Sequence, residues 1–196
     1  GAHPGLPDRM GFGRRVIQMD AAELEKHMVY QVGALQAIAA AAGHRVTHVS
    51  YHAALGNMAT ADRAVADTLA RAIARIDRDL IVFSMPETEV EHAAKRAGLR
   101  CLTIFLADRA YEDDGSLVAR GKPNAVITSH EAVKARVKRF LEDAVVETRT
   151  GKMLPMRARS ILVHSDTPGA AGARSRARPR APSATRSPRA RGGGPA

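Results

Sequence analysis

The spacing of apolar residues near the start of the chain changes from a helical to a strand-like period. Apolar side chains recur at three- and four-residue intervals over residues 21–42, which predicts a helix. Asp20 can cap the first turn of this helix, and Gly43 can end its last turn. A short β-rich run follows at residues 46–50. The chain therefore begins its regular structure with a helix and then a strand.

The same alternation continues toward the middle of the chain. A second helix is expected from Asp62, with apolar residues on one face, followed by a continuous apolar run at residues 80–83. Such a run is typical of a strand buried on both faces. A third helix is expected over residues 87–97, with Pro86 in its first turn and Gly98 at its end.

The second half of the chain repeats this pattern. A strand is predicted at residues 100–106, a long loop at 107–124, a short apolar run at 125–128, a helix at 129–146 and a last strand at 159–163. Alternating helices and strands predict an α/β fold, a parallel sheet or barrel wrapped by helices.

Charge is concentrated at the end of the chain. The sequence has 30 Lys and Arg against 20 Asp and Glu, a net charge of +10, whereas residues 1–173 carry only +3. Residues 171–196 contain Ala, Arg, Gly, Pro, Ser and Thr but no large apolar residue, so we expect a disordered tail. Two origins would explain the composition of this tail: a frameshift in a GC-rich reading frame, or a functional basic arm that binds nucleic acid. The missing aromatic residues favour the frameshift, and nucleic acid is not an expected partner.

One cysteine, Cys101, lies in an apolar run and is expected to be a buried residue of a strand. A single cysteine cannot form a disulfide within the chain, which fits a reducing compartment and predicts a cytoplasmic location. The sequence has neither a secretory apolar segment at its start nor a run of 18 apolar residues, so no contact with a membrane is predicted.

Polar residues that could support chemistry follow the predicted strands. In parallel α/β folds the carboxyl ends of the strands meet at one rim, where ligands bind. Titratable groups at several strand ends favour a functional site there over isolated structural roles. These groups are His3, His52, Asp108 and His164.

The first eight residues form a loop rich in Gly and Pro that carries His3 and Asp8. Such a loop can hold polar side chains over a pocket without regular strand pairing. A loop of this kind ordinarily follows a strand, so we expect the beginning of the domain to lie upstream of residue 1.

Several segments, taken in order, are similar to the LamB/YcsF family. They are Gly1-Ala2-His3-Pro4-Gly5, Gly11-Phe12-Gly13-Arg14-Arg15, Tyr30-Gln31-Val32-Gly33-Ala34-Leu35, His48-Val49, His52 with Ala54-Leu55 and Asn57, Ala107-Asp108-Arg109-Ala110-Tyr111, and Val163-His164-Ser165-Asp166-Thr167-Pro168-Gly169-Ala170. The resemblance covers residues 1–170. It implies an incomplete (β/α) barrel of the glycoside hydrolase/deacetylase type, here without its N-terminal strands, followed by an aberrant tail at 171–196.

The resemblance also implies an activity. Family members are described as the A subunit of bacterial 5-oxoprolinase, which opens the lactam of 5-oxoproline to L-glutamate at the expense of ATP and acts with subunits B and C. The chain departs from the family pattern at Ser50, where members have a lysine, and at Thr103 and Ile104, where they commonly have acids.

The matched residues suggest roles in this reaction. ATP, with Mg²⁺, can activate an amide oxygen by phosphorylation, after which a base near neutrality assists the attack of water. His52 and His164 are predicted as acid/base or metal-adjacent groups, Asp108 and Asp166 as carboxylates that orient a histidine or Mg²⁺, and Arg14 and Arg109 as anion-binding groups. Further substrate or nucleotide contacts are predicted at His3, Asp8 and Asn57.

Other interpretations remain open. Asp108 and Arg109 could form a local ion pair, and Asp166 could cap a turn before Pro168. A rim of His and Asp on a related barrel could instead hold Zn²⁺ in a deacetylase-like hydrolase of a carbohydrate or amide. The chain could also be an inactive truncated remnant. The sequence does not identify a metal ion.

Overall fold

The computed structural model describes residues 1–165 and residue 167. The helices are α1 (Ala21–Ala41), α2 (Ala53–Ala61), α3 (Arg63–Ile76), α4 (Glu89–Arg96) and α5 (His130–Asp143). The strands are β1 (His48–Val49), β2 (Ile81–Ser84), β3 (Cys101–Leu106), β4 (Val145–Glu147), β5 (Met153–Pro155) and β6 (Ser160–Leu162). The predicted tail at 171–196, like Asp166 and the end of the predicted domain, lies outside the described residues.

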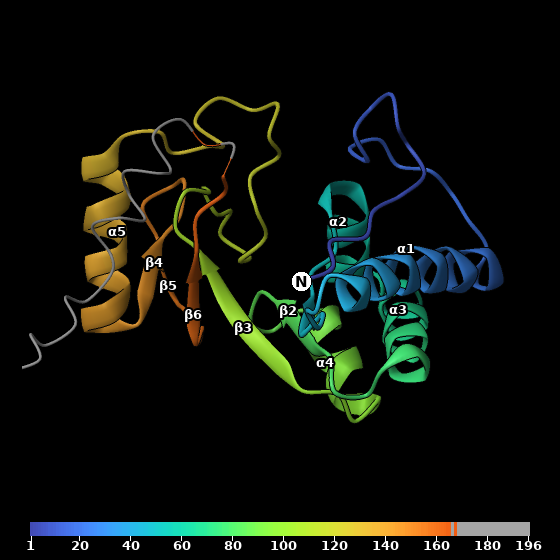
Figure 1. Ribbon diagram of the computed structural model, residues 1–196. Coiled ribbons are helices and arrows are strands. Elements are labelled where there is room, and N and C mark those ends of the chain that lie inside the picture. The colour runs from blue at the N-terminus through green and yellow to red at the C-terminus, as the bar shows by residue number, and fades with distance from the viewer. Residues whose placement is uncertain (166, 168–196) are drawn as a thin grey trace, which may run out of the picture.

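Four strands form one sheet in the order β1-β2-β3-β6, and every neighbouring pair is parallel. Ala2 forms a parallel bridge with Val49, which adds the first residues of the chain to the free edge of β1. The strands run side by side with helices around them (Figure 1), so the predicted parallel α/β architecture is confirmed. Their carboxyl ends share one edge of the sheet.

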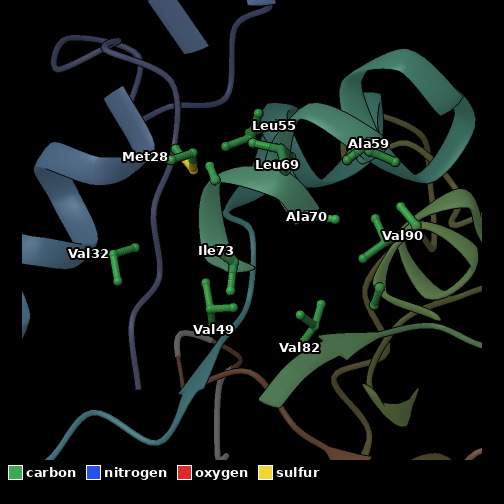
Figure 2. Close-up of a cluster of buried hydrophobic side chains, with 14 of the residues drawn as sticks. Met28, Val32, Val49, Leu55, Ala59, Leu69, Ala70, Ile73, Val82 and Val90 are labelled. Atoms are coloured by element: carbon green, nitrogen blue, oxygen red, sulfur yellow. The ribbon is translucent and has the colours of Figure 1, made fainter. Parts of the chain in front are cut away.

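The larger core lies between the helices of the first half and the strands β1 and β2. Side chains from α1, α2, α3 and α4 gather in one cluster with Val49 of β1 and Val82 of β2 (Figure 2), and this cluster joins the helices to the sheet. Its labelled members are Met28, Val32, Val49, Leu55, Ala59, Leu69, Ala70, Ile73, Val82 and Val90.

A second core surrounds the end of β3. In Figure 1, β3 extends from the group of helices α1–α4 toward α5, β6 and the hairpin of β4 and β5. The ring of Phe105 packs on Phe140 of α5 and on Tyr111, with centroids 4.8 and 6.2 Å apart. The guanidinium of Arg136 lies over the rings of Phe105 and Tyr111 and donates hydrogen bonds to three carbonyl groups, those of Ala107, Arg109 and Glu147.

Helix ends follow the predicted caps in two cases. The Asp20 carboxylate accepts a hydrogen bond from the Glu23 amide at the start of α1. Asp62 likewise accepts from Ala64 and Val65 at the start of α3. Both caps satisfy amides that have no partner inside the helix, and both predicted helices are confirmed.

The predicted start of α4 and the predicted end of α5 are wrong. Thr88 caps α4, and its hydroxyl accepts a hydrogen bond from the Glu91 amide, so Pro86 lies before the helix rather than in its first turn. At the other end, Ala144 adopts a left-handed conformation with φ of 54° and stops α5 after Asp143. Residues 145–146 therefore belong to β4 rather than to the predicted helix.

Three elements were not predicted. The segment after His52 forms α2, and the chain between α5 and β6 forms the antiparallel hairpin of β4 and β5. The apolar run at 125–128 is not a strand, although Val126 makes an isolated bridge with Arg109. Cys101 begins β3 and is only half-buried.

Candidate functional site

The first loop is anchored along β1 at the carboxyl edge of the sheet. The Ser50 amide donates a hydrogen bond to the Ala2 carbonyl at 3.0 Å, and the His52 amide donates to the Pro4 carbonyl at 2.8 Å. These backbone bonds hold residues 2–4 beside residues 50–52. They place the imidazole of His3 directly against that of His52.

His3 and His52 form a pair whose outer nitrogens bind backbone carbonyls. Nδ1 of His3 donates to the Ser50 carbonyl, and Nε2 of His52 donates to the Phe12 carbonyl, both at 2.8 Å. Carbonyl oxygens only accept, so both outer nitrogens carry hydrogen. The inner nitrogens, His3 Nε2 and His52 Nδ1, face each other at 3.0 Å.

His3 is exposed at the edge of the sheet, yet the protein around its imidazole changes its titration. Partial desolvation lowers the pKa of His3, the hydrogen bond to Ser50 opposes this effect, and the nearby charges of His52 and His164 lower the pKa further. The neutral form of His3 is therefore favoured.

Helix α1 holds the turn of the first loop. The side chain of Gln31 accepts a hydrogen bond from the Gly5 amide at 3.1 Å and donates to the Gly5 carbonyl at 2.9 Å. His27 donates to the same carbonyl from Nε2 at 3.1 Å. Three hydrogen bonds from one helix thus fix the loop two residues after His3.

The buried carboxylate of Asp8 organises the next part of the loop. It accepts hydrogen bonds from the amides of Gly11 and Arg15 at 2.8 and 3.1 Å, and it forms an ion pair with the Arg15 guanidinium. The hydrogen bond from Arg15 is the main reason that the pKa of Asp8 lies well below its usual range. These bonds close the loop over residues 8–15. They leave Asp8 directed into the loop, and its predicted contact with a ligand stays a prediction.

A glycine is required where this loop passes His52. Gly13 has a φ of +66°, and a Cβ atom there would lie 2.9 Å from Cδ2 of His52. Only glycine combines this backbone conformation with so close an approach. The approach positions the Phe12 carbonyl to accept the hydrogen bond from His52.

Asp108, at the end of β3, holds His164, which follows β6. The backbone N–H and the Nδ1–H of His164 both donate to the Asp108 carboxylate at 2.9 Å, and the Thr167 hydroxyl donates to it as well. Asp108 is fully buried. Burial by itself raises the pKa of Asp108, but the hydrogen bonds from His164 and Thr167 outweigh it and lower the pKa to about 2. The carboxylate therefore keeps Nδ1 of His164 protonated and leaves Nε2 available.

Arg109 points into the long loop that follows β3. Its buried guanidinium donates to the carbonyls of Ala125 at 3.1 Å and Val118 at 2.7 Å. Burial lowers the pKa of Arg109, and the charges of Arg120 and Arg14 act in the same direction. Asp108 and Arg109 thus bind different partners rather than each other, so the local ion pair is wrong. The predicted anion contact of Arg109 stays a prediction.

The remaining predicted residues lie around this group. Arg14 is exposed, and its guanidinium lies 5.7 Å from the centroid of the Phe12 ring. Asn57 is exposed on α2, on the turn after His52. The charge of His164 is close enough to lower the pKa of His3. The sheet therefore brings His3, His52 and His164 to one edge from three separate parts of the sequence.

Two hollows lie near this edge. One, of about 320 Å³, lies between the first loop and α1 and includes His3, Tyr30 and Gln31 in its lining. The other, of about 580 Å³, lies beyond β2, and its lining includes Thr60, Thr88, Tyr111, Ser116 and Arg157. The second hollow is lined by none of the predicted site residues.

The carboxylates of Asp8 and Asp108 both bind neighbouring groups of the protein. Both oxygens of Asp8 and of Asp108 already accept hydrogen bonds. Within residues 1–165 and 167, no group of three or more His, Cys, Asp and Glu side chains is arranged around a common metal position. The binding of Mg²⁺ with a nucleotide stays a prediction.

Two contributors to this site, Thr167 and Gln31, were not predicted. The Thr167 hydroxyl donates to Asp108, and Gln31 clamps the Gly5 backbone. Both residues lie in the segments that resemble the family, but neither stands at a strand end with a titratable side chain. Their partners are 59 and 26 residues away in sequence, so no local pattern points to these contacts.

The LamB/YcsF family model matches residues 1–187 of this 196-residue chain. The chain belongs to the LamB/YcsF family. Among its relatives, the protein named as the first 5-oxoprolinase A subunit of Bradyrhizobium diazoefficiens is 69% identical over 169 residues, which cover 86% of this chain and 66% of that protein. The second 5-oxoprolinase A subunit of Agrobacterium fabrum is 57% identical over 169 residues, which again cover 86% of this chain and 66% of that protein. This LamB/YcsF chain thus matches about two thirds of the length of these relatives.

A solved structure supports the same fold. The crystal structure of the lactam utilization protein from Thermus thermophilus superposes with a TM-score of 0.81 at 36% sequence identity. The match covers 88% of this LamB/YcsF chain and 70% of the other. In the described part of the chain, no helix has the length and apolar character needed to cross a membrane.

Proposed function

We propose that this chain is the A subunit of an ATP-dependent 5-oxoprolinase, which opens the lactam of 5-oxoproline to L-glutamate together with subunits B and C. The main support is the 69% identity to a protein named as a 5-oxoprolinase A subunit. The name of the solved relative, a lactam utilization protein, agrees with this substrate class. We expect a cytoplasmic enzyme, since its single cysteine fits a reducing compartment.

Opening a lactam requires proton transfers that His164 can perform. Water must lose a proton as its oxygen bonds to the lactam carbonyl carbon, and the ring nitrogen must gain one as its bond to that carbon breaks. With Nδ1–H held by Asp108, Nε2 of His164 can take the first proton and deliver the second. Histidine suits both steps because it titrates near neutral pH.

ATP, when bound with Mg²⁺, would supply a phosphoryl group that makes the lactam carbonyl carbon more electrophilic and that leaves as inorganic phosphate when a second water completes the hydrolysis. Arg14 is the exposed cation of the predicted set and is the side chain we expect to contact an anion. Arg109 supports the neighbouring loop through two carbonyls. Asp108 binds His164 and Thr167 and orients the imidazole of His164.

The test combines the chain with subunits B and C and measures release of glutamate from 5-oxoproline with and without ATP. We expect release only with ATP, and we expect the His164→Gln variant to release much less. Equal release without ATP would favour a simple hydrolase instead. No release from the complete mixture would refute the proposed function.

A further inference from the structure

In two neutral imidazoles, the hydrogen bonds of His3 and His52 to backbone carbonyls leave no hydrogen on either inner ring nitrogen. Each ring must place a hydrogen on its outer nitrogen, because the Ser50 and Phe12 carbonyls can only accept. Two neutral imidazoles have no further N–H. The inner nitrogens, His3 Nε2 and His52 Nδ1, then present two lone pairs to each other at 3.0 Å. This arrangement is repulsive unless a positively charged species lies between or beside the two nitrogens.

We propose that His3 and His52 form a binding site for a divalent transition-metal ion, coordinated by Nε2 of His3 and Nδ1 of His52. The ion is of the class that imidazole nitrogens prefer, such as Zn²⁺. This site goes beyond the proposed 5-oxoprolinase activity and does not depend on it.

The outer hydrogen bonds support a metal ion more strongly than a shared proton. Histidines that bind metal ions usually donate their other ring N–H to a carboxylate or a backbone carbonyl, which fixes the tautomer and the ring orientation. Both His3 and His52 have this arrangement, with both carbonyls at 2.8 Å.

The backbone around the pair is rigid enough to hold two ligands in place. Residues 2–4 are tied to residues 50–52 by backbone hydrogen bonds, and Gly5 is clamped by Gln31. Gly13 brings the loop of residues 8–15 against the ring of His52. A metal ion would therefore bind to rings whose positions are already determined.

The site would keep open coordination positions. In the described part of the chain, no third His, Cys, Asp or Glu completes a ligand set with this pair. His3 is exposed, so water or a substrate oxygen can occupy the other positions. Two protein ligands leave positions of a tetrahedral shell open, unlike a closed structural site with four protein ligands.

The experiment titrates the metal-free chain with Zn²⁺, followed by calorimetry, and with Co²⁺, followed by its visible absorption. The variants are His3→Gln and His52→Gln, and the control is His44→Gln, which changes an exposed histidine after α1. We expect one ion per chain, binding at least about 10-fold weaker in each variant, and unchanged binding in the control. Binding that is equally tight in both variants and the wild type, or no binding by the wild type, would overturn the proposal.

A second measurement needs no substitution. Nitrogen NMR of the wild-type imidazoles reports which ring nitrogens carry hydrogen. We expect Zn²⁺ to shift the signals of His3 Nε2 and His52 Nδ1 and to leave hydrogen on both outer nitrogens. Signals that stay unchanged when Zn²⁺ is added would refute the site, even if a variant fails to fold. Neither measurement uses 5-oxoproline or ATP, so this proposal and the proposed activity can fail separately.

Discussion

The Nδ1–H of His164 donates a hydrogen bond to the carboxylate of Asp108 at 2.9 Å, across 56 residues of sequence. The two residues follow β3 and β6, which are parallel neighbours in the sheet. Because the backbone N–H of His164 binds the same carboxylate, the ring and its main chain are fixed together. This geometry gives His164 one defined tautomer, and the first two predictions concern this pair.

Replacing His164 by Gln should lower turnover of the 5-oxoprolinase complex by roughly 10²–10⁴-fold, the usual contribution of a general acid or base. The side chain of His164 is partly exposed and belongs to neither large hydrophobic cluster, so the midpoint of thermal unfolding should fall only by what the lost hydrogen bond to Asp108 contributes. Steady-state kinetics and thermal melts check this, with His44→Gln as the control. A variant that keeps its turnover but melts much earlier would show that His164 is only structural.

Asp108→Asn should change how stability depends on pH. The pKa of Asp108 is lowered to about 2 in the folded chain. Its carboxylate therefore stabilises the fold at pH values above the pKa that an aspartate has in the unfolded chain. This contribution, about 2 kcal/mol at neutral pH, is lost as the pH falls from about 4 toward 2. Urea unfolding across this range should show a smaller pH dependence for Asp108→Asn than for the wild type. Identical pH dependence in both would contradict the lowered pKa.

Ala144→Gly should stabilise the chain by about 0.5–1 kcal/mol. Ala144 ends α5 with φ of 54°, a conformation that costs energy for alanine but not for glycine. The matched control is Ala135→Gly, an exposed position inside the same helix, which should destabilise by about 1 kcal/mol. Chemical unfolding measures both changes. If both substitutions destabilise the chain, Ala144 does not have the left-handed backbone conformation at the end of α5.

Arg109→Lys should destabilise the chain by roughly 1–3 kcal/mol, because one ammonium cannot reproduce the guanidinium contacts and leaves a buried carbonyl without a partner. The affected carbonyls are those of Val118 and Ala125. Hydrogen exchange should speed up over residues 118–127, and the exposed Arg78→Lys is the control. Unchanged stability combined with weaker ATP binding would instead support Arg109 as an anion-binding group.

The sequence by itself determined the order and type of most elements. Periodic apolar positions and the capping residues Asp20 and Asp62 were enough to locate α1 and α3, because caps and periodicity act within a few residues. The polar residues at strand ends could be predicted as one group, since parallel strands align their carboxyl ends. The pairing of specific side chains could not be predicted in this way.

The tertiary structure alone decided which of these residues touch. The end of α5 depends on the backbone conformation of Ala144, which β4 and its pairing with β5 impose from outside the helix. Asp108 meets His164 because β3 pairs with β6, and Arg109, the next residue, turns the other way into its loop. His3 meets His52 because the first residues pair with β1. These contacts join residues tens of positions apart, and only the packing of the whole sheet brings them within hydrogen-bonding distance.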